Sequence, residues 1–203
     1  MKNKSLKVLG ILVLVSVLFT GCSKLPQAEI DAVNASIAEA STAGADIYLK
    51  DNYVALQDSM RVILADIEGK KSKLFKNYSA ATDRLVNLNG MAQEVTKQTI
   101  IRKEELKNEI LSMVAEAEKL VTINYNLILE APKGKEGTTA LLAIKGELSA
   151  IETTIQDTKG LVDQGEYLTA MDKIKAGQEK AQMINTELTD VITKYKSNVR
   201  NRK

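Results

Sequence analysis

Apolar residues recur at alternating intervals of three and four along almost the whole chain after residue 26. This spacing places them on one side of an α-helix, and when sustained it is typical of long helices packed along a shallow left-handed seam. No window shows the strict alternation of apolar and polar residues that predicts a half-buried strand. The sequence therefore predicts an all-α fold, an antiparallel bundle of long, coiled-coil-like helices.

Proline and glycine positions divide this pattern into five expected helices. Pro26 suits a first helical turn, and Pro132 with two nearby glycines marks the clearest loop. We expect helices over residues 26–49, 51–88, 91–130, 138–163 and 166–197, forming one bundle domain over 26–199. The apolar or small residues expected on their buried stripes include Gly44, Ile47, Met60, Met91, Met113, Leu120, Ile123, Leu127, Leu148, Ile151 and Val191. Gly69 is expected to be a weak point inside the second helix, because glycine costs about 1 kcal/mol relative to alanine there.

The pair Asn89-Gly90 leaves two interpretations open. It suits a turn between helices, but the apolar phase continues across Gly90, so one helix from Asp51 to Glu130 also fits. Eighty residues of helix would extend for about 120 Å, and the other expected helices are too short to cover such a rod. We therefore favour the hairpin.

The first 21 residues have the layout of a cleaved secretory signal peptide. Three lysines precede an apolar run from Val8 to Phe19, and small residues follow it. Twelve residues of helix span about 18 Å, too short to cross a bilayer core of about 30 Å comfortably. An ordinary signal peptide with an incidental cysteine, or an uncleaved anchor, is the simpler alternative.

Cys22 is the only cysteine in the 203 residues, and it follows Thr20-Gly21 at the expected cleavage point. Phe19-Thr20-Gly21-Cys22 resembles the lipobox of bacterial lipoproteins, although leucine is commoner at the position of Phe19. The resemblance implies cleavage between Gly21 and Cys22, a diacylglyceryl group on the Cys22 sulfur, an N-acyl group such as palmitate on its new amino terminus, and residues 22–25 as a short tether. Several acyl chains hold a protein to its membrane essentially permanently. Ser23, in place of the aspartate that marks inner-membrane retention, implies the outer membrane facing the periplasm, or the cell membrane in an organism with one membrane.

A second, weaker resemblance concerns the helices themselves. Gly165-Glu166-Tyr167 followed by spaced small residues is similar to the opening helix of tetratricopeptide-like repeats, and Asp51-Asn52-Tyr53 echoes it. With the Ala-Gly-Ala stretch at 43–45, the chain looks like the alanine-rich helical domain of unknown function found in envelope lipoproteins. A full 34-residue repeat is not legible.

Composition argues against several function classes. The chain contains no histidine, and a lipidated Cys22 leaves no free thiol, so the commonest general base, metal ligand and thiol nucleophile are missing. Residues 1–21 hold three of the 28 basic residues and none of the 26 acidic ones, so the rest has a net charge of about −1. This balance gives no footprint for nucleic acid. We expect neither an enzyme nor a metal or cofactor site beyond the acyl groups.

One basic cluster stands out as a candidate contact with lipid headgroups or a polyanion: Lys70, Lys71, Lys73 and Lys76. A solvated helix face is the simpler interpretation of these lysines. The glutamates between 104 and 118 alternate with lysines, which favours surface ion pairs over a metal site.

The sequence predicts an envelope lipoprotein with a structural or protein-interaction role, held to its membrane by lipid and binding an envelope protein or the cell wall. The alternative is a periplasmic carrier or chaperone that binds apolar ligands or unfolded outer-membrane proteins. The sequence does not indicate the partner or the oligomeric state.

Overall fold

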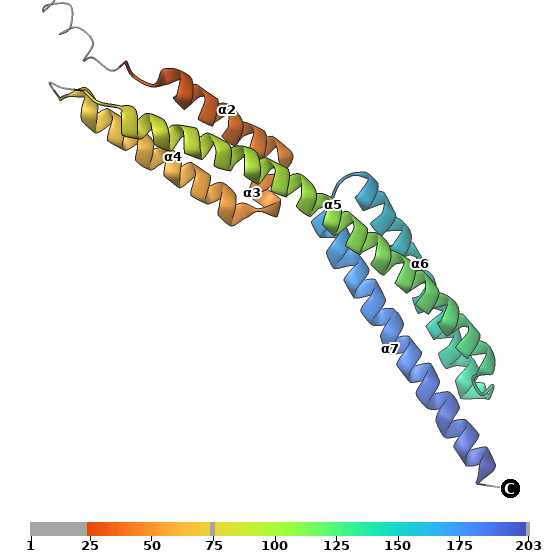
Figure 1. Cartoon of the computed structure of the whole chain (residues 1–203). Helices are drawn as coiled ribbons and strands as arrows, with labels where there is room; N and C mark the ends of the chain where they lie inside the picture. Colours follow the sequence, from red (N-terminus) through yellow and green to blue (C-terminus); the bar gives the residue numbers. More distant parts are fainter. Residues whose placement is uncertain (1–23, 74–75, 202–203) are drawn as a thin grey trace, which may run out of the picture. The chain divides into compact units, whose positions relative to one another are not determined.

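The computed structural model describes residues 24–73 and 76–201, except for the side chains of 135 and 136. The predictions for residues 1–23, including Cys22, therefore lie outside the described residues. The described part contains six helices and no strand, which confirms the all-α helical bundle (Figure 1). They are α2 (Gln27–Ala43), α3 (Ala45–Tyr48), α4 (Lys50–Lys71), α5 (Ser79–Glu130), α6 (Lys135–Asp163) and α7 (Tyr167–Arg200).

The helix expected over 26–49 is interrupted at Gly44. This residue adopts a left-handed conformation with φ of 97°, in which its N–H donates to carbonyls of the last turn of α2. Ala45 then becomes the buried residue at the start of α3, whereas Ile47, expected on the buried stripe, is 58% exposed. Glycine adopts this backbone conformation without strain because it has no Cβ. Gly44, which the periodicity assigned to a packing stripe, therefore ends helix α2 instead.

The hairpin predicted at Asn89-Gly90 is wrong, because α5 runs without interruption from Ser79 to Glu130. The chain turns earlier, between α4 and α5, so the single rod from Asp51 to Glu130 is wrong as well. The Gly69 segment is the last turn of α4. On the other side of the turn, the Asn77 side-chain oxygen accepts hydrogen bonds from the Ser79 backbone N–H and hydroxyl, both at 2.9 Å, and so begins α5.

The described chain forms two compact units, whereas the sequence predicts one bundle domain. Unit 1 extends to Arg102 and unit 2 begins at Lys103, so the division lies within α5. In unit 1, α2, α3 and α4 pack with the first part of α5 around a core that includes Leu56 and Leu85. In unit 2, the rest of α5 packs with α6 and α7, and Ile110, Ile155 and Ile174 lie in its core.

Contacts between named side chains establish the register of unit 2. Glu118 on α5 contacts Lys159 on α6, and Tyr125 on α5 contacts Glu152 on α6. From the first pair to the second, the residue number rises by seven on α5 and falls by seven on α6. The two helices are therefore antiparallel, and the contacts between them recur after one heptad. Helices α6 and α7 lie close together at Gly177, where an added Cβ would lie 3.1 Å from Thr154 Cγ2.

The predicted stripes of α4 and α6 are confirmed at their central positions. The predicted stripe of α5 is wrong by one residue at Met91, at Met113 and beyond Ala117, and the structure buries Ala92 and Val114 in place of the two methionines. The sequence predicts Leu120, Ile123 and Leu127 on the buried side, and the structure buries their neighbours instead: Val121, Asn124 and Ile128. Likewise, α7 buries Ile192 rather than Val191. Helix α6 also begins three residues earlier than expected, since the Thr138 N–H already donates to the Gly134 carbonyl.

Candidate functional site

Gly21 and Cys22, the predicted cleavage and lipidation residues, lie outside the described part of the chain. No described helix is both long enough and apolar enough to cross a membrane. Within the same residues, no group of three or more histidine, cysteine or acidic side chains is arranged to hold a metal ion. The predicted attachment to a membrane through Cys22 therefore stays a prediction.

The four lysines of the predicted basic cluster lie at the end of α4 and in the turn after it. Lys70 Nζ is 2.8 Å from a carboxylate oxygen of Asp66, and Lys71 Nζ is 2.7 Å from one of Glu68. The hydrogen bond from Lys70 lowers the pKa of Asp66, and the bond to Glu68 raises the pKa of Lys71. These ion pairs join residues one turn apart on the same helix, so Lys70 and Lys71 have local partners. Lys73 is exposed in the turn.

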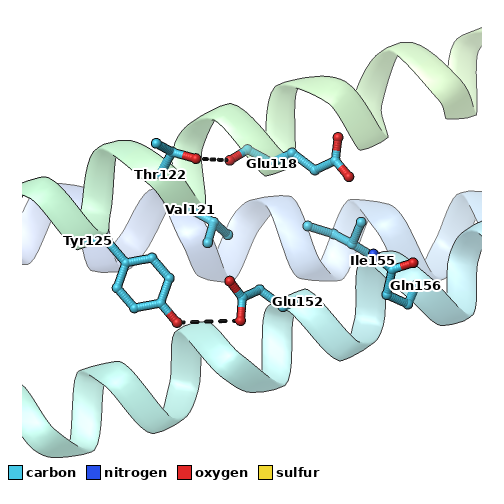
Figure 2. Close-up of a pocket in the computed structure, with 7 residues that line it drawn as sticks. All are labelled: Glu118, Val121, Thr122, Tyr125, Glu152, Ile155 and Gln156. Carbon is cyan, nitrogen blue, oxygen red and sulfur yellow. Dashed lines mark hydrogen bonds between the residues drawn. The ribbon is translucent and has the colours of Figure 1, made fainter.

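A groove of about 290 Å³ runs between α5 and α6 within unit 2. Figure 2 shows Tyr125 and Glu152 meeting across it, with Val121 and Ile155 lining its floor between the two helices. The Tyr125 hydroxyl donates to a Glu152 carboxylate oxygen at 3.4 Å, which is long for such a bond. Glu118, which also lines the groove, forms an ion pair with Lys159 at 2.7 Å.

Burial and charge both act on Tyr125. Desolvation of the ring raises the pKa of Tyr125 above its usual range, and the neighbouring Glu152 carboxylate raises the pKa further by repelling a tyrosinate. The phenol is therefore neutral and a hydrogen-bond donor throughout the physiological range. This arrangement suits recognition of a polar group by the Tyr125 hydroxyl and the Glu152 carboxylate rather than proton abstraction.

Sequence reasoning missed a fully buried amide side chain of unit 2. Asn124 is fully buried, and its side-chain N–H donates to the Ala181 carbonyl on α7 at 2.8 Å. Its oxygen accepts from the Asn185 side-chain amide, also at 2.8 Å. The sequence does contain a signal for the burial of Asn124, because intervals of four, three and four counted from Ala117 lead to residues 121, 124 and 128. The more apolar residues Ile123 and Leu127 instead favoured a stripe one residue out of step.

A related polar contact joins two helices of unit 1. The Ser36 hydroxyl on α2 donates to the Asn89 side-chain oxygen on α5 at 2.7 Å. Asn89, which the sequence assigned to a turn, thus connects helices instead. Every buried side-chain nitrogen and oxygen in the described residues has a hydrogen-bond partner.

No protein-family model matches this chain, and neither a curated protein nor a solved structure shows significant similarity to it. The resemblances to a lipobox and to an alanine-rich, tetratricopeptide-like helical domain are therefore untested by relatives.

Proposed function

We propose that this protein is a lipid-anchored lipoprotein of the bacterial cell envelope whose helical units bind another envelope component. The observation that carries the proposal is the position of Cys22, the only cysteine, directly after Thr20-Gly21 and a short apolar run. A cysteine acylated there holds the chain at a membrane surface through several acyl chains. Ser23 favours the outer membrane in an organism with two membranes.

The described geometry supports a binding role. Both units are packed bundles whose outer helix faces mix charged residues with exposed apolar ones. Adjacent Ile100 and Ile101 on α5 are both exposed, as is Met183 on α7. Interfaces between proteins draw on such surfaces, where a few apolar anchors are surrounded by polar residues.

The test compares the intact mass and membrane fractionation of the wild-type protein with those of Cys22→Ala. We expect the wild type to lack residues 1–21, to carry added acyl mass and to fractionate with the outer membrane. Cys22→Ala should lose the acyl mass and leave that fraction. If both proteins have the same mass modification and location, the lipoprotein proposal is wrong.

A matched variant tests the sorting step separately. Ser23→Asp keeps Cys22 and the preceding residues, so acylation should be unchanged while the protein moves to the inner-membrane fraction. Acylated protein that stays in the outer-membrane fraction after this substitution would contradict the role given to Ser23 but not the lipid anchor. Cross-linking in cells from the exposed positions 101 and 183 would then identify the envelope partner.

A further inference from the structure

One end of unit 2 exposes leucine side chains to an unusual extent. Leu129 near the end of α5 is 69% exposed, and Leu142 on α6 is 70% exposed, although leucine is among the residue types most often buried. Both line a groove of about 220 Å³ between the two helices, together with Ile128 and Leu141. Side chains this exposed project into solvent, so they do not enclose a ligand.

The charge at this groove is positive. Lys133 and Lys145 line it, and none of the described side chains in its lining is acidic. The groove at Tyr125 differs, because Glu118 and Glu152 line that one. A groove with projecting leucines, two lysines and no acidic side chain in its described lining is therefore a feature of this end of the unit rather than of the α5–α6 seam as a whole.

The end of α7 lies beside the same groove. Lys196 Nζ is 3.0 Å from a carboxylate oxygen of Glu130, the last residue of α5, which places the final turns of α7 at this end. Leu141 also lines a second groove with Val191 of α7, so the two apolar linings adjoin. Glu187 lies in that second groove, whereas Tyr195 and Val199 beyond it are exposed.

Positive charge is concentrated in this last part of the sequence. Residues 194–203 include five basic residues and no acidic one: Lys194, Lys196, Arg200, Arg202 and Lys203. We call the surface formed by Leu129, Lys133, Leu142, Lys145 and the α7 turns at 194–200 the basic end of unit 2. It combines exposed leucines, a tyrosine and several cations within one region.

We propose that the basic end of unit 2 binds the surface of an anionic phospholipid bilayer. Leucine and tyrosine side chains enter the boundary between headgroups and acyl chains, while lysines lay their stems along apolar surface and keep their ammonium groups among the phosphates. Each basic residue near an anionic membrane strengthens binding by about fivefold. The projecting leucines fit a bilayer surface better than a single enclosed acyl chain. This contact goes beyond the proposed lipid anchor and does not depend on Cys22.

The experiment uses the full chain carrying Cys22→Ala, so that one introduced thiol is the only one. A bimane label at Leu142→Cys reports on the basic end, and the same label at the exposed Met183→Cys is the control within unit 2. Both proteins are mixed with vesicles of phosphatidylglycerol and phosphatidylcholine, or of phosphatidylcholine alone. Any attachment through residues 1–21 is common to all variants, so the difference between labels reports on the basic end.

We expect the emission of the Leu142→Cys label to shift to the blue on anionic vesicles but not on phosphatidylcholine, and the Met183→Cys label to stay unchanged. Adding Lys133→Gln and Lys145→Gln should raise the lipid concentration for half-maximal response by about 30-fold. Lys119→Gln with Lys175→Gln, which removes the same charge from exposed positions elsewhere in unit 2, should have little effect. Circular dichroism confirms that each variant is folded.

Several results would overturn the proposal. The first is an unchanged Leu142→Cys label on anionic vesicles, and the second is an equal shift on phosphatidylcholine. The third is an equal loss of response in the Lys119→Gln, Lys175→Gln control. A label that responds to soluble polyglutamate but not to anionic vesicles would replace the bilayer with an acidic protein partner.

Discussion

The Asn124 side-chain oxygen accepts a hydrogen bond from the Asn185 amide at 2.8 Å, inside the packed seam between α5 and α7. The same Asn124 side chain donates to the Ala181 carbonyl, so both ends of its amide are bonded to α7. Rotating α5 by one residue would bury Ile123 but remove these bonds. The pair therefore selects one register of α5 against α7, as a single buried asparagine does in a coiled coil.

Replacing Asn124 with alanine should lower the free energy of unfolding by about 1–3 kcal/mol. The substitution leaves the buried Ala181 carbonyl without its side-chain donor and opens a small cavity. Asn185→Ala is the matched control, since it removes one of the two bonds at a partly exposed position and should cost about 1 kcal/mol or less. Urea denaturation followed by circular dichroism measures both. A larger loss in Asn185→Ala than in Asn124→Ala would contradict the role of Asn124.

Gly44 and Gly90 should respond in opposite directions to replacement by alanine. Gly44→Ala places a side chain at φ of 97° and close to the Tyr48 ring, and should cost about 1–2 kcal/mol. Gly90 lies within α5 with no atom near its added Cβ, so Gly90→Ala should stabilise the fold by about 0.5–1 kcal/mol. Thermal unfolding of the two variants measures this contrast. Loss of stability in Gly90→Ala would instead favour a turn at Asn89-Gly90.

The close approach of α6 and α7 at Gly177 should not tolerate a large side chain. Gly177→Leu forces an isobutyl group against Thr154 and should cost about 1–3 kcal/mol through overpacking. Gly146→Leu is the control, because this exposed helical glycine has no atom near its added Cβ and gains helix propensity. Chemical denaturation compares the two. Equal effects of the two substitutions would show that the helices do not meet closely at Gly177.

Stability should decline above pH 10 in part because of Tyr125. Its folded pKa is raised, so the contribution is present below the unfolded pKa of about 10 and is lost as pH rises through the folded pKa. Tyr125→Phe should change stability little at pH 7, because the bond to Glu152 is long, and should reduce the decline at high pH. Unfolding measured between about pH 9 and 11 tests this, with Tyr195→Phe as the exposed control. An unchanged decline in Tyr125→Phe would show that Tyr125 does not titrate abnormally.

The fold class and most helix positions were predictable because they depend on local information. Spacing of three and four in α4 and α6 identified buried residues such as Met60, Leu148 and Ile151, all of which lie in the core. The loop at Pro132 and the turn before Tyr167 were predicted within a few residues, since proline and glycine act on their own backbone.

The candidate sites were less predictable. Lys70 and Lys71 were identified as a cluster, but their pairing with Asp66 and Glu68 depends on which rotamers a helix surface allows. Leu129 and Leu142 lie 13 residues apart in the sequence, on either side of a loop, and only packing of α5 against α6 puts them in one groove with Lys133 and Lys145.

The sequence by itself determined that this chain is helical, where most of its turns lie, and that a solitary cysteine follows a signal-like segment. Tertiary structure alone decided whether Asn89-Gly90 turns the chain, which phase of α5 is buried, and where the chain divides into two units. Helix propensity and periodicity are local and nearly equal for the competing phases, so the outcome depends on contacts with other helices. The hydrogen bonds from Ser36 to Asn89 and from Asn124 to Ala181 are formed only when those helices meet.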